Sequence, residues 1–310
     1  MTAAASAIHA FNRFEIKYVA SFAQVERLRV ELDRAMAPDP HAGADGYRVE
    51  SVYYDSPALR FYWEKVDGLR FRRKLRLRRY GSGPAPSHSP VFVEIKQRVN
   101  RVTQKRRIDL PYADAVRLCA GQAVALPRSA SVAQTRLVDE IVELCAVERL
   151  RPMVTTCYQR QAYVGRHSDL GLRVTIDRRL RGRDRDFELG AASTDRLTLP
   201  PSLAVVEVKA DHRVPYWLTD LTGRHDLTVV RLSKYCRSVE AFGLVPRAAH
   251  APSGQDFFDD PDLSGGQRGL GGQSGGGQGP RDDQEASSAV PSAWPSAVPT
   301  DFQSHDTASD

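Results

Sequence analysis

The sequence predicts an α+β fold in which about eight antiparallel strands form a barrel or a strongly curved sheet. Three observations lead to this expectation. Segments of alternating apolar and polar residues recur through the first 246 residues, short polar loops separate them, and only four segments have the apolar period of a helix. The 310-residue chain is 41% hydrophobic and 26% charged, as globular proteins are, and it contains no repeat of fixed period.

The N-terminal half combines one helix with five strands. Ser21 precedes an apolar stripe at helical spacing, and Gln24 stands three residues later, so the pair predicts a capping box. Pro38 should end this helix, and Asn100 should form the turn of a hairpin. The strands expected here are residues 11–18, 47–55, 69–80, 91–99 and 103–110.

The following segment should contain three helices and four more strands. A short helix ends at Gly121, and a longer one begins at Ser131 with Gln134 completing a second capping box. The last helix should span residues 233–242 and end at Gly243. The strands expected here are residues 153–164, 170–177, 186–189 and 203–209.

Composition divides the chain at about Pro246 into a folded domain, residues 1–246, and a tail, residues 247–310. The tail is rich in Gly, Ser, Pro, Gln and Asp and has few apolar residues to bury, so we expect it to be disordered. It carries three Arg and ten acidic residues, whereas the domain carries 41 basic and 28 acidic residues. A basic domain with an acidic tail suggests a polyanionic ligand: nucleic acid, an anionic membrane surface or a phosphate chain.

Other classes of protein are disfavoured by features that the sequence lacks. A membrane-spanning helix needs about 20 consecutive apolar residues, and no segment of the sequence approaches this length, so we expect no integral membrane segment. The N-terminus also has no secretion signal. The four cysteines form no CxxC pair, which fits a reducing compartment, and we expect a cytoplasmic protein. No GxxxxGK[ST], GxSxG or HExxH motif occurs. We also expect no nucleic-acid partner, because the basic residues alternate with carboxylates along strands.

The polar faces of the expected strands are unusually rich in charge. Four cations share one face of a single strand: Arg72, Lys74, Arg76 and Arg78. The pattern Glu-x-Lys occurs on three separate strands, as Glu15/Lys17, Glu94/Lys96 and Glu207/Lys209. On any one strand these groups could simply face solvent, where cross-strand ion pairs contribute little. If the faces converge, however, the cations repel one another unless a polyanion or divalent cations lie between them.

This set of residue types suits phosphate chemistry. Arginine binds phosphate oxygens through two parallel N–H groups, and lysine supplies a point charge. Carboxylates could hold Mg²⁺ or Mn²⁺, which prefer oxygen ligands and bridge phosphates. Phosphoryl transfer can proceed by positioning and electrostatic stabilisation, without a nucleophile from the protein.

Nine segments between residues 11 and 243 resemble the VTC domain, the polyphosphate polymerase module of the triphosphate tunnel (CYTH-like) superfamily, and they occur in that family's order. The segments are RFEIKY (13–18), SVYYDSP (51–57), RKLRLRRY (73–80), VFVEIKQRV (91–99), QKRRIDLPY (104–112), YQRQAY (158–163), LRVTID (172–177), VVEVKA (205–210) and LSKYCRSVE (232–240). The resemblance implies an eight-stranded antiparallel tunnel-like β-barrel with helices packed outside. It also implies transfer of the γ-phosphate of ATP onto inorganic polyphosphate inside a basic tunnel, with Mn²⁺ or Mg²⁺.

The resemblance also assigns site residues. The implied catalytic residues are Arg76, Arg78, Lys209 and Lys234. The implied phosphate-binding residues are Lys17, Lys96, Lys105, Arg160 and Arg173. Glu207 is the first candidate metal ligand and Glu94 the second. Arg160 and Arg173 could instead be structural partners of acids such as Asp177.

One position departs from the wider superfamily. Arg13 stands where its triphosphatases have the first Glu of Glu-x-Glu-x-Lys, which favours holding a long anion over metal-dependent hydrolysis. A metal-dependent tripolyphosphatase or nucleotide triphosphatase and a non-catalytic polyphosphate-binding protein remain the alternatives. We expect the module to act without an attached regulatory domain. The sequence leaves open the direction of the reaction, the preferred metal, the primer and the oligomeric state.

Overall fold

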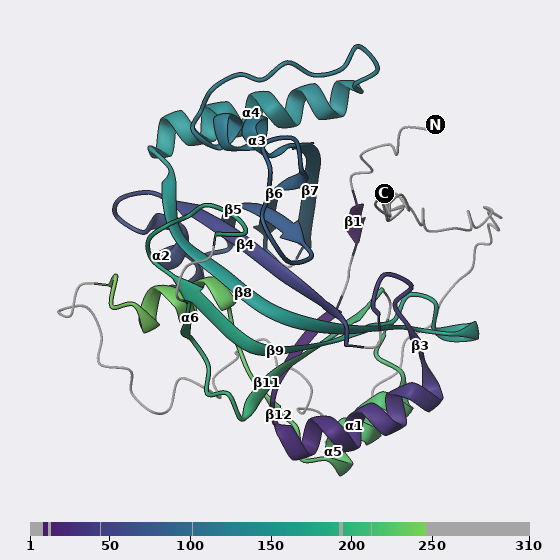
Figure 1. Ribbon diagram of the computed structural model, residues 1–310. Helices are drawn as coiled ribbons and strands as arrows, with labels where there is room; N and C mark the ends of the chain where they lie inside the picture. The colour runs from purple at the N-terminus through teal and green to yellow at the C-terminus, as the bar shows by residue number, and fades with distance from the viewer. Residues whose placement is uncertain are drawn as a thin grey trace, which may run out of the picture. The chain divides into compact units, whose positions relative to one another are not determined.

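The computed structural model describes residues 9–11, 14–43, 45–100, 102–191, 195–211 and 213–245 of the chain. Arg13 and the tail at 247–310 lie outside these residues, so the expectations about them and the domain boundary at 246/247 stay predictions. The described residues form one twelve-stranded antiparallel sheet with six α-helices, which confirms the α+β class (Figure 1). No helix among them is both long enough and apolar enough to cross a membrane.

The strands pair in the order β1-β7-β6-β5-β4-β8-β9-β11-β2-β12, while β10 pairs with β9 and β3 with β8. The strands are β1 (His9–Phe11), β2 (Phe14–Ser21), β3 (Ala37–Pro38), β4 (Tyr47–Asp55), β5 (Phe71–Tyr80), β6 (Pro90–Val99), β7 (Val102–Pro111), β8 (Arg151–Val164), β9 (Arg173–Arg183), β10 (Arg196–Leu197), β11 (Leu203–Ala210) and β12 (Thr228–Val229). The helices are α1 (Phe22–Ala35), α2 (Arg60–Val66), α3 (Tyr112–Cys119), α4 (Val132–Glu148), α5 (Tyr216–Arg224) and α6 (Lys234–Ala241), with a 3₁₀ turn, η1 (His167–Asp169).

Most of the predicted elements are present. Both capping boxes form, with the side chain of Ser21 accepting from Gln24 N and that of Ser131 from Gln134 N. Asn100 has the left-handed φ of 54° that the tight β6–β7 turn requires. The strand predicted at 186–189 is wrong, because residues 186–188 are irregular and a turn begins at 189. Helices α2 and α5 were not predicted.

The sheet is strongly curved but is not a closed barrel of eight strands. Its pairings run from β1 to β12, and no ladder joins the two ends among the described residues, so closure is not confirmed. Curvature nevertheless brings distant strands together. Lys96 on β6 lies 3.2 Å from Glu15 on β2, although five strands separate β6 from β2 in the pairing order.

Side-chain alternation gives the sheet two different faces. We define the outer face as the one that carries Val93 and Ile95 of β6, and the inner face as the one that carries Glu94 and Lys96. On the outer face, β5, β6 and β7 pack against α3 and α4, and β2, β9 and β11 pack against α1 and α5. The apolar residues of the strands therefore pack against the helices on the outer face, and the charged residues lie on the concave inner face.

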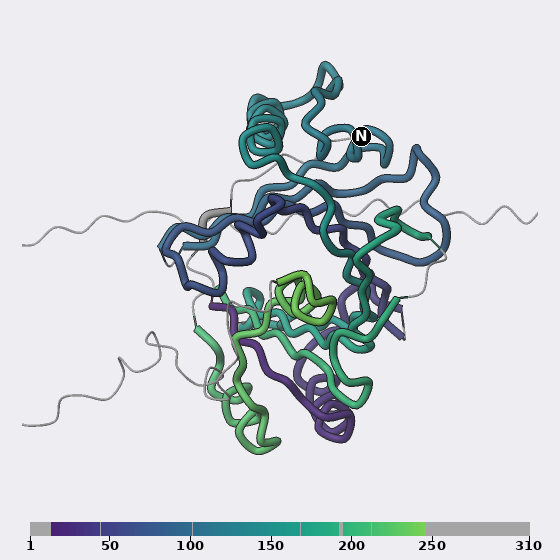
Figure 2. The backbone as a smooth tube through the Cα atoms, turned by 90° about the vertical axis from the view of Figure 1, so that its left-hand side faces the viewer, coloured from purple at the N-terminus to yellow at the C-terminus, as the bar shows by residue number. Residues whose placement is uncertain are grey.

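Helix α6 lies on the inner side, where Figure 2 shows the strands curving around it. Tyr235 of α6 stacks on Tyr53 of β4 with ring centroids 5.2 Å apart, and Val239 packs with Met153 and Val154 of β8. The helix begins at Ser233, whose side chain accepts from Cys236 N and from Nζ of Lys74. The N-terminus of α6 is therefore held against β5 within the concave face.

Candidate functional site

The inner face contains the charged residues that the sequence predicted. Four carboxylates, Glu15, Glu94, Asp177 and Glu207, lie among the predicted cations. The nine predicted cations are Lys17, Arg76, Arg78, Lys96, Lys105, Arg160, Arg173, Lys209 and Lys234. Eight of them contact these four carboxylates, and only Arg173 does not. Positive charge therefore exceeds negative charge on this face.

The first cluster surrounds Glu94, which is 1% exposed. Its Oε2 accepts from Nε of Arg76 at 2.6 Å, and its Oε1 lies 2.5 Å from Nζ of Lys105. Arg78 approaches Oε2 at 3.9 Å and donates from Nε to the hydroxyl of Ser51. Although burial acts in the opposite direction, Arg76 and Lys105 hold the pKa of Glu94 well below its ordinary value. Glu94 is therefore an ionised anchor for the surrounding cations.

The second cluster joins β2, β11 and β6. Lys17 contacts Glu15 at 2.8 Å, and Lys209 contacts Glu207 at 2.7 Å. Because Glu207 is opposite Lys17 in the antiparallel register, the two pairs form a square of alternating charge. Burial opposes the shift, but Lys209 and Lys17 hold the pKa of Glu207 well below its ordinary value. Burial, together with Lys17 and Lys209, lowers the pKa of Lys96 to about 8, while Glu15 opposes this.

The third cluster centres on Asp177 of β9. Arg160 binds both of its carboxylate oxygens, at 2.7 and 2.8 Å, and Lys234 of α6 lies 2.6 Å from Oδ2. Arg160 is thus the structural partner of Asp177 that the sequence analysis considered as an alternative. Arg173 instead donates to Asp39, beyond β3, and lies 3.4 Å from the hydroxyl of Tyr47, at the edge of the inner face.

Two aromatic residues at the inner face were not predicted as site residues. Tyr53 accepts from Nη1 of Arg76 at 3.0 Å, and Tyr158 accepts from Nη2 of Arg78 at 3.2 Å. Burial alone would raise the pKa of Tyr53, but Arg76, Arg78 and Lys74 lower it to about 7. The alternation of β4 could have identified Tyr53, because it lies two residues after Ser51, which accepts from Arg78 on the inner face, and therefore points to that face as well.

Glu207 is better suited to hold a divalent cation than Glu94. Among the described residues, no group of three or more Asp, Glu, His or Cys side chains forms a ready metal site. Mg²⁺, however, commonly binds through one or two carboxylates together with phosphates and water. Glu207 and the nearby Glu15 are ionised oxygen donors on adjacent strands, which fits this requirement. Arg76 and Lys105 contact both oxygens of Glu94, and Lys17 and Lys96 contact both oxygens of Glu15, whereas Lys209 contacts Glu207 through Oε1.

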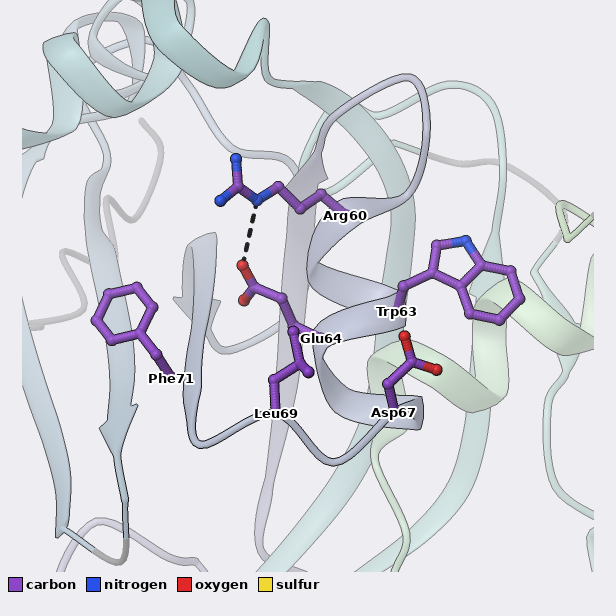
Figure 3. Close-up of a pocket in the computed structure, with 6 residues that line it drawn as sticks. All are labelled: Arg60, Trp63, Glu64, Asp67, Leu69 and Phe71. Carbon is purple, nitrogen blue, oxygen red and sulfur yellow. Dashed lines mark ion pairs between the residues drawn. The ribbon is translucent and has the colours of Figure 1, made fainter.

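A separate pocket of 310 Å³ lies beside α2 and the segment that leads into β5 (Figure 3). Arg60 and Glu64 form an ion pair of 3.4 Å in this pocket, the exposed Leu69 lies beside Glu64, and the exposed Phe71 stands apart from them across the pocket. None of the predicted site residues lines this pocket. It is therefore distinct from the charged inner face.

The chain is similar to a known family, to a curated protein and, weakly, to a solved structure. The family model described as VTC domain matches residues 12–242. Vacuolar transporter chaperone complex subunit 4 of Trypanosoma brucei brucei (strain 927/4 GUTat10.1) is 28% identical over 239 residues, which cover 67% of this chain and 29% of the relative. The chain thus spans less than a third of that relative. A chain in the solved structure of the Schizosaccharomyces pombe Mediator head module is 10% identical in sequence, and the match covers 74% of this chain and 95% of that chain. Its TM-score of 0.33 is too low to bear on the fold.

Proposed function

Because this chain belongs to the VTC domain family, we propose that it is a polyphosphate polymerase that transfers the γ-phosphoryl group of ATP onto a growing inorganic polyphosphate chain. In this reaction a terminal phosphate oxygen of the chain attacks the γ-phosphorus of ATP. The bond between that phosphorus and the bridging β–γ oxygen breaks, and ADP leaves. The chain becomes longer by one phosphate.

The observation that supports this proposal most is the contact between Lys96 of β6 and Glu15 of β2. These strands are far apart in the pairing order, so the 3.2 Å contact requires their charged faces to turn toward each other. A concave face with more cations than carboxylates concentrates polyanions and strengthens their binding. Solvent-facing ion pairs on a flat sheet would not produce such a contact.

The clusters suit different parts of the reaction. Arg76 and Arg78 are aligned by Glu94, Tyr53 and Ser51, so their remaining N–H groups can bind phosphate oxygens in a fixed geometry. On the opposite wall, Lys17 and Lys209 supply compact charges that can compensate the negative charge developing during transfer. The binding of ATP and polyphosphate would displace some of the present ion pairs.

A divalent cation, Mn²⁺ or Mg²⁺, would be held by Glu207, with Glu15 as a second donor once its ion pair with Lys17 or Lys96 opens. Such a cation supplies charge neutralisation between phosphate oxygens. Glu94 was the second candidate ligand from the sequence, and its contacts favour the role of an anchor for Arg76 and Lys105 instead.

A gel-based turnover assay tests this function. The purified full chain is incubated with ATP and Mn²⁺ or Mg²⁺, and the products are resolved by size while ADP is measured. We expect ADP formation together with chains that lengthen with time. Release of free phosphate without chain growth would support the tripolyphosphatase or nucleotide triphosphatase alternative. Tight polyphosphate binding without turnover would support a non-catalytic binding protein.

A further inference from the structure

A second arginine-rich site lies on the outer face of the sheet, away from the inner face. A pocket of 590 Å³ opens beside β8 and β9, and four arginines line it: Arg48, Arg178, Arg179 and Arg181. This volume is in the range of small-molecule sites. The ladder residues Cys157 and Gln159 of β8 lie opposite Arg181 and Arg178, and Arg178 contacts Glu26 of the outer helix α1.

A β-bulge in β9 brings the arginines of this strand together. The register pairs Gln159 with Arg178 but Cys157 with Arg181, so one extra residue is inserted between these pairs. In a regular strand, Arg178 would point to one face and Arg181 to the other. The extra residue shifts the alternation, so that both line the outer pocket, while Leu180 packs on the inner side.

Arg179, the inserted residue, has a left-handed φ of 52°. This conformation is unfavourable for a residue with a side chain, and glycine would adopt it without strain. The bulge therefore adds a third arginine from β9 to the same pocket, at a cost in backbone energy.

Two of the four arginines of the pocket have carboxylate partners. Arg178 lies 3.5 Å from Glu26, Arg48 lies 3.7 Å from Asp195 and 4.0 Å from Glu50, and Asp45 also lines the pocket. The side chains of Arg179 and Arg181 have no hydrogen bond or ion pair with the part of the chain that the structure describes. Burial, together with the neighbouring Arg29 and Arg179, lowers the pKa of Arg178.

We propose that this outer pocket binds a condensed phosphate, the chemical group that nucleoside triphosphates and inorganic polyphosphate share. Several guanidinium groups in one concave site match the multiple oxygens of such a chain. Phe22, which is 56% exposed at the edge of the pocket, offers an apolar surface for a base if the ligand is a nucleotide. Binding at this site requires no turnover at the inner face, although Tyr158, which accepts from Arg78 on the inner face, also lines the outer pocket.

Calorimetric titration of the full chain with tripolyphosphate, without metal, tests the proposal. The wild type should bind two molecules per chain. The variant Arg179→Gly/Arg181→Gln should lose the outer site, with its affinity reduced at least about tenfold, and retain the inner one. Its Tm should be unchanged or higher, because glycine suits the left-handed position. The control Arg128→Gln/Arg149→Gly removes the same charge from two exposed residues, and Arg149 also has a left-handed φ of 51°.

Titration with ATP distinguishes the two sources of the ligand. If Phe22→Ala weakens the binding of ATP at the outer site but not that of tripolyphosphate, the site binds a nucleotide. If the affinities for both ligands are unchanged, the site binds inorganic chains. An Arg179→Gly/Arg181→Gln variant that binds tripolyphosphate with the same stoichiometry and affinity as its control would overturn the proposal. A wild-type chain that binds one molecule, which the variant then loses, would support the outer site and refute binding at the inner face. Because the readout is stoichiometry, failure here is separate from failure of the turnover assay.

Discussion

Replacement of Arg76 by methionine should destabilise the fold as well as abolish turnover, because Arg76 is the main partner of the buried Glu94. Two guanidinium nitrogens of Arg76 lie 2.6 Å from Oε2 of Glu94. After Arg76→Met, only the partly exposed Lys105 and the more distant Arg78 would compensate this carboxylate.

The expected loss of stability follows from the cost of leaving a buried charge without its partner. Removing one member of a buried ion pair costs about 3–5 kcal/mol. For a domain of this size, that corresponds to a fall in Tm of roughly 10 °C. Urea denaturation and thermal unfolding of the Arg76→Met variant measure these quantities directly.

A second substitution separates the structural role of Arg76 from its role in catalysis. In Arg76→Met/Glu94→Gln, the buried charge is gone, so most of the lost stability should return. Turnover should remain absent, because the phosphate-binding guanidinium is still missing. A stable Arg76→Met single variant would refute the anchoring role of Glu94. An active double variant would refute the phosphate-binding role of Arg76.

Three further predictions concern pH, metal and the tail. Because burial and the neighbouring lysines lower the pKa of Lys96 to about 8, its positive charge is lost as the pH rises through 8, and tripolyphosphate affinity should fall about tenfold from pH 7 to 9. Tyr53, with a pKa of about 7, ionises in the same range, so Lys96→Arg should reduce this dependence to the part that Tyr53 contributes; an unchanged profile would contradict the role of Lys96. Glu207→Gln should abolish metal-stimulated turnover but strengthen metal-free tripolyphosphate binding, as calorimetry can measure; metal-stimulated turnover at the wild-type level would exclude Glu207 as a ligand. A chain ending at Pro246 should keep its turnover and Tm, and a large loss of either would assign the tail a structural or inhibitory role.

Local patterns predicted most of the fold. Period-two alternation identified β4 and β6 closely, and the Ser21/Gln24 capping box located the start of α1, because these signals depend on neighbouring residues only. Helix α2 was missed because it begins after Leu59, a left-handed residue without a side-chain cap. The β9 bulge at Arg179 was also unpredictable, since the register of β9 depends on pairing with β8.

The site was predicted to a similar extent. Lys105, which the resemblance implied to bind phosphate, lies on the inner face, and the next residue, Arg106, points to the outer face, as alternation along a strand requires, and pairs with Glu140 of α4. The ion-pair partner of each cation could not be predicted from the sequence, because it depends on the curvature of the sheet and on the side-chain rotamers. Arg173 reaches Asp39 rather than the central clusters for this reason. The roles of these residues in phosphate binding and catalysis stay predictions.

A crystal structure of the chain with bound tripolyphosphate tests the central claim most directly. If the inner face is a binding surface for phosphate chains, phosphates should lie between Arg76 on one wall and Lys17 and Lys209 on the other, with the ion pair between Lys96 and Glu15 opened or rearranged. An inner face without phosphate, at concentrations that fill the outer arginine pocket, would contradict it.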